Sequence, residues 1–521
     1  MKLTLVNLPT LVSNPKRLPL VQEPPLGLAY VAAALAERGH DVRAVDGLGE
    51  GIGRLSPFRD GFHLHGLPIA EIVERIEPDS DAIGIGVMFS GTWPLARALI
   101  DAIRARFPRT AIICGGEHVT ALTRFVMTDA PIDYAVVGEG EETVAELAAH
   151  LAGEPGALPL EGIEGLAYRT ADGAIATTPR RRRRRALDEI AWPAWGLFPL
   201  QRYMDTPLFF ATSLQAHQRP MVILATRGCP YTCKFCSNEQ MWGINYFMRD
   251  PVDVVDEMEH YVRRYGATDF HFNDLTPIIN ARWARQLCEV LIARDLGVTW
   301  KTASGTRSEA LDLDLLQKMH ASGCDEIVLA PESGSPEILA INRKRVKLDK
   351  LLTVARLVRD HHIGMRVTAL MIVGFPEETL RDVLRSYRLL ARMARGGFST
   401  VYVSRFMAYP GCEYHAIAAG DGRITHGDEF FFNLQRNLTL MNVRNSGTSW
   451  HPRWSGRVIW VLAMLGYAVF FGTYYASKPL EVARGVRGVL RNQPRSRFEH
   501  FLANLLWRPP AREPALRPPP S

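Results

Sequence analysis

The sequence predicts an α/β protein in which two regions of parallel strands are followed by a mainly helical C-terminal extension. Apolar strand-like runs alternate with helical segments over the first third of the chain, and the alternation resumes at Met221. A third observation is an uncharged apolar run at residues 458–476. The chain has 521 residues, of which 22% are charged and 47% are hydrophobic. This length exceeds what one core usually supports, so we expect two or three domains.

The first third has the pattern of a doubly wound sheet. Met1 begins an apolar strand, Leu26–Arg38 has helical periodicity that ends at Gly39, and Asp41–Asp46 is a second strand. Further strands and helices are predicted at Ala82–Val87, Trp93–Arg106, Ala111–Cys114 and Tyr134–Val137, and from about Thr120 and Glu142. This alternation predicts a parallel sheet with helices on both faces, of the flavodoxin-like (Rossmann-like) size class. Such sheets bind ligands at the carboxyl ends of their strands, where this chain has glycine-rich segments.

The middle third repeats the alternation. Its strands are predicted at Met221–Ala225, Asp269–Phe272, Thr299–Ala303, Glu326–Ala330, Arg366–Ile372 and Thr400–Phe406. Helices such as Val252–Tyr265, Arg282–Arg294 and Leu311–Ser322 lie between them. Six parallel strands linked by helices predict a partial (β/α)6 barrel, whose functional residues belong at the carboxyl ends of the strands.

Three cysteines lie on one short loop after the first of these strands. Cys229, Cys233 and Cys236 have the spacing C-x-x-x-C-x-x-C. Three thiolates at such short spacing can hold three corners of a 4Fe-4S cluster and leave one iron open. The alternatives are a zinc site, which normally needs a fourth ligand, and a chance group of core cysteines. Residues 237–248 contain no second Cys/His pair, so the pattern favours the cluster.

The remaining cysteines and the charges set the cellular context. The other four cysteines are isolated, which predicts small buried apolar residues and not a disulfide framework; they are Cys114, Cys288, Cys324 and Cys412. We therefore expect an intracellular, oxygen-protected protein. The net charge of +6 does not predict a nucleic-acid partner. The run Arg180–Arg185 is read as a solvated linker or as a nucleic-acid patch, and the lack of interleaved aromatic residues favours the linker.

The cysteine loop, with Phe235 before its last cysteine, resembles that of the radical S-adenosylmethionine (SAM) superfamily. The resemblance implies that Cys229, Cys233 and Cys236 ligate the catalytic cluster and that the open iron chelates the amino and carboxylate groups of SAM. Reduction, by an electron donor such as flavodoxin or ferredoxin, then cleaves SAM to a 5′-deoxyadenosyl radical.

Segments after the later strands resemble the SAM-binding motifs of the same superfamily. The family often has an acidic pair for the SAM ammonium after the second strand, where this chain has Asn273 and Asp274, so Asp274 is the expected acceptor. The other segments are similar to the family's T-R, ribose-side, G-x-P-x-E-T and closing P-G-T motifs. Their residues are Ser304, Arg307, Glu332, Ser333, Gly374, Pro376 and Pro410-Gly411-Cys412, with Cys in place of Thr. A lone Asp or Ser at a strand end is more often a helix cap, so the order of the motifs carries the prediction.

The first domain resembles cobalamin-binding domains, which carry D-x-H-x-x-G, then a Ser, then Gly-Gly. The corresponding residues here are Asp46, Leu48, Gly51, Ser90, Gly115 and Gly116, and Gly138 follows the next strand. Leu48 stands where the cobalt-ligating His would be, so the resemblance implies cobalamin without a protein imidazole on its lower face. The alternative is a flavodoxin-like domain that keeps the fold without the cofactor.

The predicted organisation has four parts. They are a cobalamin-binding domain at residues 1–152, a linker at 153–216, a radical SAM core at 217–415 and a C-terminal extension at 416–521. In the extension, residues 458–476 have the length of a membrane span, with basic flanks and aromatic residues near both ends. The alternatives are a helix buried in the protein or one that lies at the membrane surface.

The resemblance predicts a cobalamin-dependent radical SAM enzyme that methylates an unactivated carbon of a small hydrophobic substrate. One alternative is a radical SAM cyclase or oxidoreductase of the anaerobic tetrapyrrole-cyclase type. Another, from a different class, is a non-catalytic cobalamin or redox sensor. We expect a cytoplasmic protein attached to the cytoplasmic face of the membrane.

Overall fold

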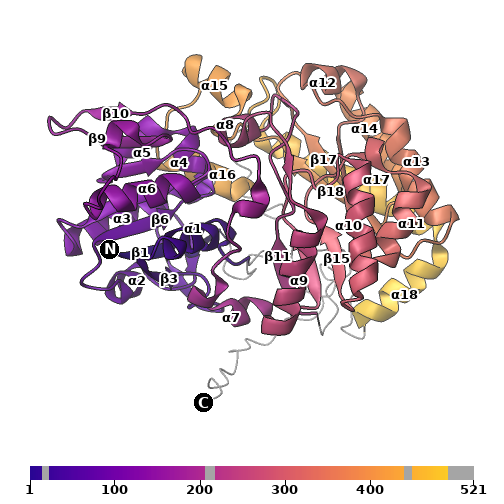
Figure 1. Cartoon of the computed structure of the whole chain (residues 1–521). Helices are drawn as coiled ribbons and strands as arrows, with labels where there is room; N and C mark the ends of the chain where they lie inside the picture. The colour runs from indigo at the N-terminus through magenta and orange to yellow at the C-terminus, as the bar shows by residue number, and fades with distance from the viewer. Residues whose placement is uncertain (14–22, 206–217, 439–448, 491–521) are drawn as a thin grey trace.

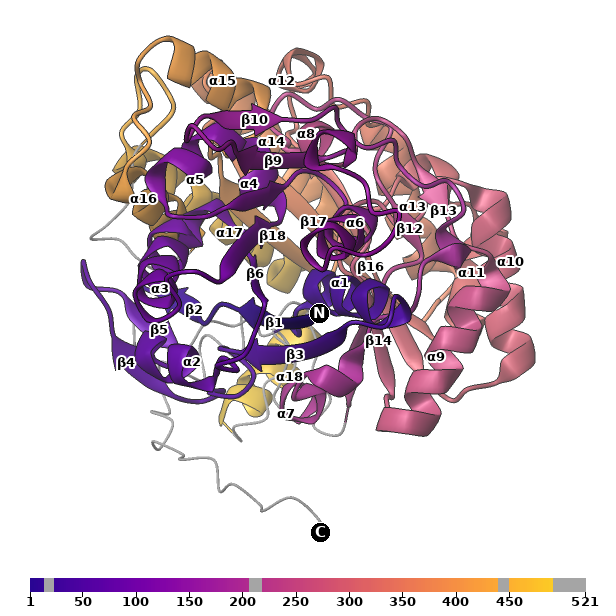
Figure 2. The ribbon, with the colours of Figure 1, turned by 60° about the vertical axis from the view of Figure 1, so that its left-hand side comes forward.

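The computed structural model describes residues 1–13, 23–205, 218–438 and 449–490. Two α/β bodies lie side by side, one built from the N-terminal third of the chain and one from the middle (Figure 1). Helices of the C-terminal extension pack on both bodies (Figure 2). The predicted α/β fold class is therefore confirmed.

The N-terminal sheet has seven strands in the order β10-β9-β8-β7-β6-β1-β3. Their bounds are β1 Lys2–Asn7, β3 Asp41–Asp46, β6 Ala82–Gly86, β7 Ala111–Gly115, β8 Tyr134–Val136, β9 Leu166–Arg169 and β10 Ile175–Thr177. Strands β1, β3, β6, β7 and β8 are parallel to one another. The chain runs from β1 to β3 on one side and then to β6 on the other, which makes a switch point at the carboxyl ends of β1 and β6.

Helices cover both faces of this sheet, as the alternation predicts. Helices α1 and α6 share one apolar core with it, and α2, α3 and α5 share the other. The helices are α1 Leu26–Glu37, α2 Ile69–Arg75, α3 Trp93–Arg106, α4 Glu117–Ala121, α5 Thr123–Asp129 and α6 Glu141–Leu151. A small antiparallel sheet of β2 Thr10–Val12, β4 Leu55–Pro57 and β5 His63–His65 lies beside them.

Strands β9 and β10 come from a segment that the sequence indicated as a polar linker. They form an antiparallel hairpin at the edge of the N-terminal sheet. Its turn contains Asp172 and Gly173, and Gly173 has a φ of +82°, a conformation that glycine adopts without strain. These strands have only four and three residues, which is shorter than the apolar runs on which the strand prediction depended.

The second sheet has six parallel strands in the order β11-β14-β15-β16-β17-β18. They are β11 Pro220–Ile223, β14 Asp269–Phe272, β15 Thr299–Thr302, β16 Cys324–Glu332, β17 Arg366–Val373 and β18 Thr400–Arg405. The helices around it are α9 Pro251–Tyr265, α10 Ala281–Arg294, α11 Leu313–Ala321, α12 Pro336–Ile341, α13 Leu348–Asp360 and α14 Leu380–Gly396. The predicted partial barrel of six strands is confirmed.

Helix α17 (Gly456–Ser477) covers β18, the edge strand of the barrel. The backbone N–H of Val403 in β18 donates to the Tyr467 hydroxyl at 3.0 Å, and the Tyr387 hydroxyl donates to the carbonyl of Leu462 at 2.7 Å. An uncovered edge strand invites pairing with other chains, so the helix protects it. Within the described residues, α17 is the one helix long and apolar enough to cross a membrane.

Helix α16 (Asp428–Leu438) ties the extension to the N-terminal domain. Helix α15 (Glu413–Gly420) shares an apolar cluster with Phe375 and Phe406 of the barrel region, and α18 (Pro479–Leu490) contacts α17. Asp428 accepts from Arg97 and from Arg59, both at 2.8 Å. The Gln435 side chain donates to the Leu11 carbonyl at 2.8 Å. The extension therefore bridges the two bodies.

The close approach of α17 to the barrel gives a stability prediction. A Cβ atom at Gly466 would lie 3.4 Å from both Leu390 and Val403, whereas one at Gly472 would meet nothing within 4 Å. We expect Gly466→Leu to lower stability by about 1–3 kcal/mol through overpacking and Gly472→Leu to leave it equal or slightly higher. Thermal unfolding measures both, and equal melting temperatures for the two variants would contradict the docking of α17.

Candidate cofactor site between the two sheets

The cysteine loop lies at the carboxyl end of the barrel. It connects β12 (Thr226–Arg227) to α8 (Asn238–Trp242). Cys229 and Cys233 are half-buried and Cys236 is exposed. The Cys236 N–H donates to the Cys233 carbonyl at 3.0 Å, and the Thr276 hydroxyl points at the Cys229 sulfur from 3.5 Å. The three thiols thus share one short loop whose backbone is held by its own hydrogen bonds.

The spacing of the thiols fits a cluster. In the part of the chain that the structure describes, no group of three His, Cys, Asp or Glu side chains converges on one metal position. The three thiols leave the same short loop, where each can bind a separate iron at one corner of a 4Fe-4S cube. The residues present therefore fit the predicted cluster, with Cys229, Cys233 and Cys236 as its proposed ligands.

Gly228 lets the loop approach its neighbours closely. It has a φ of +92°, and a Cβ atom there would lie 2.1 Å from the Asn245 carbonyl and 2.6 Å from the Arg183 guanidinium. Only glycine fits this position without moving the backbone. The strand β13 (Phe247–Met248) pairs with β12 just beyond this contact, so the start of the loop is fixed on both sides.

Asp274, the predicted acceptor of the SAM ammonium, is fully buried behind the loop. Its carboxylate accepts from the Ala225 N–H at 3.2 Å and from the Thr226 N–H and hydroxyl, both at 2.5 Å. Burial raises the pKa of Asp274 to about 6. Its oxygens hold the strand that leads into the cysteine loop, while the preceding Asn273 donates from its side-chain amide to Glu23 at 2.9 Å.

The residues predicted after β15 and β16 gather near the loop. The Arg307 guanidinium lies over the Tyr231 ring at 4.1 Å, and Ser304 is half-buried at the end of β15. Glu332 has a φ of +62°, which is uncommon for a residue with a side chain and marks a constrained position. Ser333 is fully buried and accepts from the Ser335 N–H at 3.1 Å.

Lys344 is a residue that the motifs did not indicate. Its ammonium lies 2.9 Å from the Glu332 carboxylate and 5.9 Å from the centre of the Phe235 ring. Burial opposes its charge, but Glu332 and Cys233 outweigh that cost, so the pKa of Lys344 is raised. The lysine therefore keeps a positive charge beside the cysteine loop.

The G-x-P-x-E-T segment forms a tight turn after β17. Gly374 has a φ of +92°, and its N–H donates to the Glu378 carboxylate at 2.6 Å. Glu378 is fully buried, and burial raises its pKa to about 7. Pro376 is half-buried in the turn, and Ile459 of α17 packs on Gly374, so the extension supports this edge of the site.

The first predicted cobalamin motif, at Asp46–Gly51, contains no histidine. The Asp46 carboxylate accepts from Asn7, from the Gly49 N–H and from the Tyr203 hydroxyl, at 2.7, 3.0 and 2.9 Å. Leu48 is buried. A Cβ atom at Gly51 would lie 2.4 Å from the backbone of residues 66–67, so the close approach there requires glycine.

The later cobalamin motifs line the carboxyl ends of β6, β7 and β8. The Ser90 hydroxyl lies 3.0 Å from Nδ1 of the buried His118, and α16 packs over this pair. A Cβ atom at Gly116 would meet the Val87 carbonyl at 2.5 Å, whereas one at Gly115 would make only ordinary contact. The Gly138 N–H donates to Thr120 at 3.0 Å.

Two large apolar side chains are exposed at the end of β6. Met88 and Phe89 are 47% and 68% exposed, although the strand that leads to them is buried. Exposed apolar side chains at the switch point of a doubly wound sheet mark a ligand surface. The predicted cobalamin motifs lie at the same strand ends.

Glu139, between two of the predicted motif glycines, joins the two domains. Its carboxylate accepts from Arg183 of the linker at 2.8 Å and from Arg227, just before the cysteine loop, at 3.0 Å. Burial would raise the pKa of Glu139, but the two arginines hold it below its usual value. Glu141 adds a second carboxylate to Arg227 at 2.7 Å.

A second contact joins the domains at the other end of the loop. The hydroxyl of Ser237, which directly follows Cys236, donates to the carboxylate of Glu117, which directly follows Gly116. Burial raises the pKa of Glu117. Both ends of the cysteine loop are thus held by residues next to the predicted cobalamin motifs.

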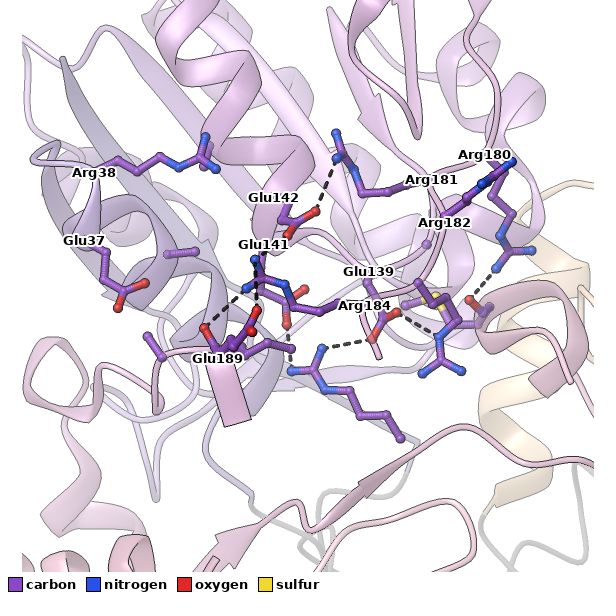
Figure 3. A pocket seen from close by; sticks show the side chains of 18 residues that line it. Glu37, Arg38, Glu139, Glu141, Glu142, Arg180, Arg181, Arg182, Arg184 and Glu189 are labelled. Atoms are coloured by element: carbon purple, nitrogen blue, oxygen red, sulfur yellow. Dashed lines mark hydrogen bonds and ion pairs between the residues drawn. The ribbon is translucent and has the colours of Figure 1, made fainter. Parts of the chain in front are cut away.

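The arginine run wraps around a cavity of about 290 Å³ beside these contacts (Figure 3). Arg181 pairs with Glu142 and Glu146, while Arg183 lies over the rings of Trp242 and Phe247 at 5.3 and 5.1 Å. Arg180 donates to the carbonyl of Met241 in α8. The run therefore has intramolecular partners, but the expected solvated linker is wrong for Arg181 and Arg183, because these partners bury their side chains to 15% and 9% exposure.

The comparisons with known families match two regions. Residues 223–390 match the radical SAM superfamily and residues 20–148 match the B12 binding domain. An uncharacterized methyltransferase of Pyrococcus horikoshii is 29% identical over 384 residues, which are 74% of this chain and 76% of that protein. Cytidylyl-2-hydroxyethylphosphonate methyltransferase of Streptomyces wedmorensis is 27% identical over 70% of this chain and 72% of its own length. Anaerobic magnesium-protoporphyrin IX monomethyl ester cyclase of Rubrivivax gelatinosus is 28% identical over 70% of this chain and 61% of its own.

Solved structures share the fold of the whole molecule. The radical SAM methyltransferase TsrM from Kitasatospora setae, with tryptophan substrate and a SAM analog bound, superposes with a TM-score of 0.61 at 16% identity. That match covers 93% of this chain and 99% of TsrM. The cobalamin-dependent radical enzyme OxsB, with aqua-cobalamin and SAM bound, gives a TM-score of 0.65 at 15% identity over 97% of this chain and 75% of OxsB.

The cysteine assignment predicts the behaviour of two variants. Cys233→Ala should abolish SAM cleavage, and anaerobically reconstituted wild-type protein should show a 4Fe-4S spectrum that changes when SAM is added. The matched control is Cys288→Ala, a buried cysteine of α10 away from the loop, which should keep the spectrum. A full complement of iron and sulfide in the triple variant Cys229→Ala, Cys233→Ala, Cys236→Ala would refute the assignment.

Proposed function

Since this chain combines a radical SAM domain with a B12-binding domain, we propose that it methylates an unactivated carbon of a small hydrophobic molecule. It is a radical SAM enzyme whose cofactors are a 4Fe-4S cluster, SAM and cobalamin. Together these groups supply a methyl donor and a hydrogen-abstracting radical when bound. The chain itself contributes binding, placement and the exclusion of side reactions.

One observation carries the proposal that the two cofactors act on one bound molecule, as methyl transfer requires. The Ser237–Glu117 and Arg227–Glu139 contacts place both ends of the cysteine loop against the strand ends that carry the predicted cobalamin motifs. A radical formed at the loop and a methyl group carried over the exposed Met88 and Phe89 side chains would then reach the same bound molecule. Proximity of this kind raises the reaction rate because the reacting groups are already held in position.

A cyclase or oxidoreductase is the second candidate. The anaerobic cyclase of Rubrivivax gelatinosus matches this chain at an identity similar to that of the methyltransferases, and ring formation would use the same two cofactors. A cobalamin or redox sensor is the third, and it would retain the cofactors without turnover. We expect an electron donor of the flavodoxin or ferredoxin type and a cytoplasmic location for each candidate.

The products of reconstituted enzyme separate the three candidates. We expect that protein supplied with cobalamin, a reductant, a lipid extract and SAM with a deuterated methyl group releases 5′-deoxyadenosine and transfers the label to a product carbon. The Cys233→Ala variant should do neither. Release of 5′-deoxyadenosine with an unlabelled, oxidised or cyclised product would favour the cyclase, and no SAM consumption with any extract would favour the sensor.

We also propose that the C-terminal helices contact a membrane surface without spanning it. The inner face of α17 is buried on the barrel at Ile459, Ala463 and Phe470, and a span would uncover β18. Apolar side chains are exposed on both α17 and α18, and exposed arginines lie on both helices. These residues are Val458, Val461, Leu465, Val482, Val486 and Leu490, with Arg457, Arg484 and Arg487. Such a surface suits the interface of an anionic leaflet.

Membrane fractionation tests this proposal. A surface-lying helix held partly by arginines should be released from membranes by high salt, because salt screens its attraction to anionic lipid. Retention after both salt and carbonate washes would instead indicate a span. Recovery of the full-length chain only in the soluble fraction would overturn the membrane contact and the lipid-like substrate that it suggests.

A further inference from the structure

Asn273 presents an unsatisfied acceptor inside the barrel. Phe270 and Phe272 of β14 belong to the core between sheet and helices, so the alternate residues His271 and Asn273 face the barrel interior. The Asn273 Nδ2 atom donates to Glu23 at 2.9 Å. Its Oδ1 atom is buried and has no hydrogen-bond partner in the described part of the chain. A buried amide oxygen left without a donor costs free energy, which a bound donor would remove.

Glu23 brings a carboxylate to the same place from the other domain. It lies just before α1 of the N-terminal domain, 250 residues from Asn273 in the sequence. Burial raises the pKa of Glu23, and His271 and Asn273 only partly oppose this. His271 is itself engaged with Asp269 at 2.9 Å. Glu23 is half-buried, and within the described residues no Lys or Arg is found to oppose the rise of its pKa.

This pair of acceptors lies close to the cysteine loop. Asp274, the next residue after Asn273, holds Thr226 before the loop, and the Thr276 hydroxyl points at the sulfur of Cys229 from 3.5 Å. The carboxyl end of β14 therefore lies against the cysteine loop, where the resemblance places SAM. The Asp274 Oδ1 atom accepts from the Ala225 N–H and from the Thr226 N–H and hydroxyl, and its Oδ2 atom accepts only from the Ala225 N–H at 3.4 Å, so this carboxylate is turned to the strand before the loop.

We propose that Glu23 and Asn273 together bind the ammonium group of SAM, so that the N-terminal domain supplies the carboxylate that this barrel strand lacks. The inference rests on the proposed use of SAM. An ammonium group has three N–H donors, and the structure offers it the Asn273 Oδ1 atom and the Glu23 carboxylate. A charge-assisted hydrogen bond to a carboxylate is stronger than one between neutral groups, so Glu23 supplies the larger share of the affinity.

The test is the affinity of the cluster-loaded full-length protein for SAM, measured by equilibrium dialysis and by the change in the cluster's electron paramagnetic resonance signal. Glu23→Gln keeps the size of the side chain and an acceptor for Asn273 but removes the charge. We expect SAM affinity to fall roughly ten- to a hundredfold. The matched control is Glu37→Gln, which changes an exposed carboxylate at the end of helix α1, the helix that Glu23 precedes, and should leave SAM affinity unchanged.

A rescue variant separates SAM binding from a structural role. Adding Asn273→Asp to Glu23→Gln returns one carboxylate to the site from the barrel strand, so it should restore most of the SAM affinity. Unchanged SAM affinity in Glu23→Gln, or a loss that Asn273→Asp does not restore, would overturn the inference. The measurement needs no substrate and no methyl transfer. Failure of the proposed methylation would therefore show in the product assay, while the wild-type protein still bound SAM.

Discussion

The buried carboxylate of Glu139, held between Arg183 and Arg227, is the interaction on which the arrangement of the two domains depends. The three side chains are 13%, 9% and 6% exposed. Breaking a buried ion pair by removing one partner costs about 3–5 kcal/mol, because the remaining charge is left without compensation. Arg227 also lies over the Tyr30 ring of α1 at 4.7 Å. The start of the cysteine loop therefore cannot move without disturbing the N-terminal domain.

This dependence explains why so much of the chain outside the two domains is used as support. The linker arginines hold α6 and α8 together, α16 ties the extension to the N-terminal sheet through Asp428, and α17 covers β18 and reaches the turn at Gly374. Radical chemistry needs a site that places its reactants and excludes others. These contacts stiffen the barrel mouth from outside, so that the interior is left for cofactors and substrate.

Sequence reasoning reached the parts of the molecule that depend on local pattern. The strand and helix alternation gave both sheets, and the spacing of Cys229, Cys233 and Cys236 singled out the loop. It did not reach features that depend on distant partners. The contacts of Asp274 depend on the pairing of β11 with β14, and the ion pair of Arg183 depends on Glu139. Glu23 belongs to another domain than Asn273. Composition alone also could not distinguish a membrane-spanning helix from a helix that packs on a sheet edge, as the apolar inner face of α17 does.

The contact between Glu23 and Asn273 connects the seating of the N-terminal domain to the proposed SAM site. If the carboxylate for the SAM ammonium comes from the segment before α1, SAM meets a complete site only when the N-terminal domain is seated on the barrel. Glu139 and Glu117, which seat that domain, lie beside the predicted cobalamin glycines. The residues that hold the domains together are therefore neighbours of both cofactor sites. A chain built in this way links tight SAM binding to an ordered N-terminal domain, which would limit radical formation in molecules that are not ready to use it.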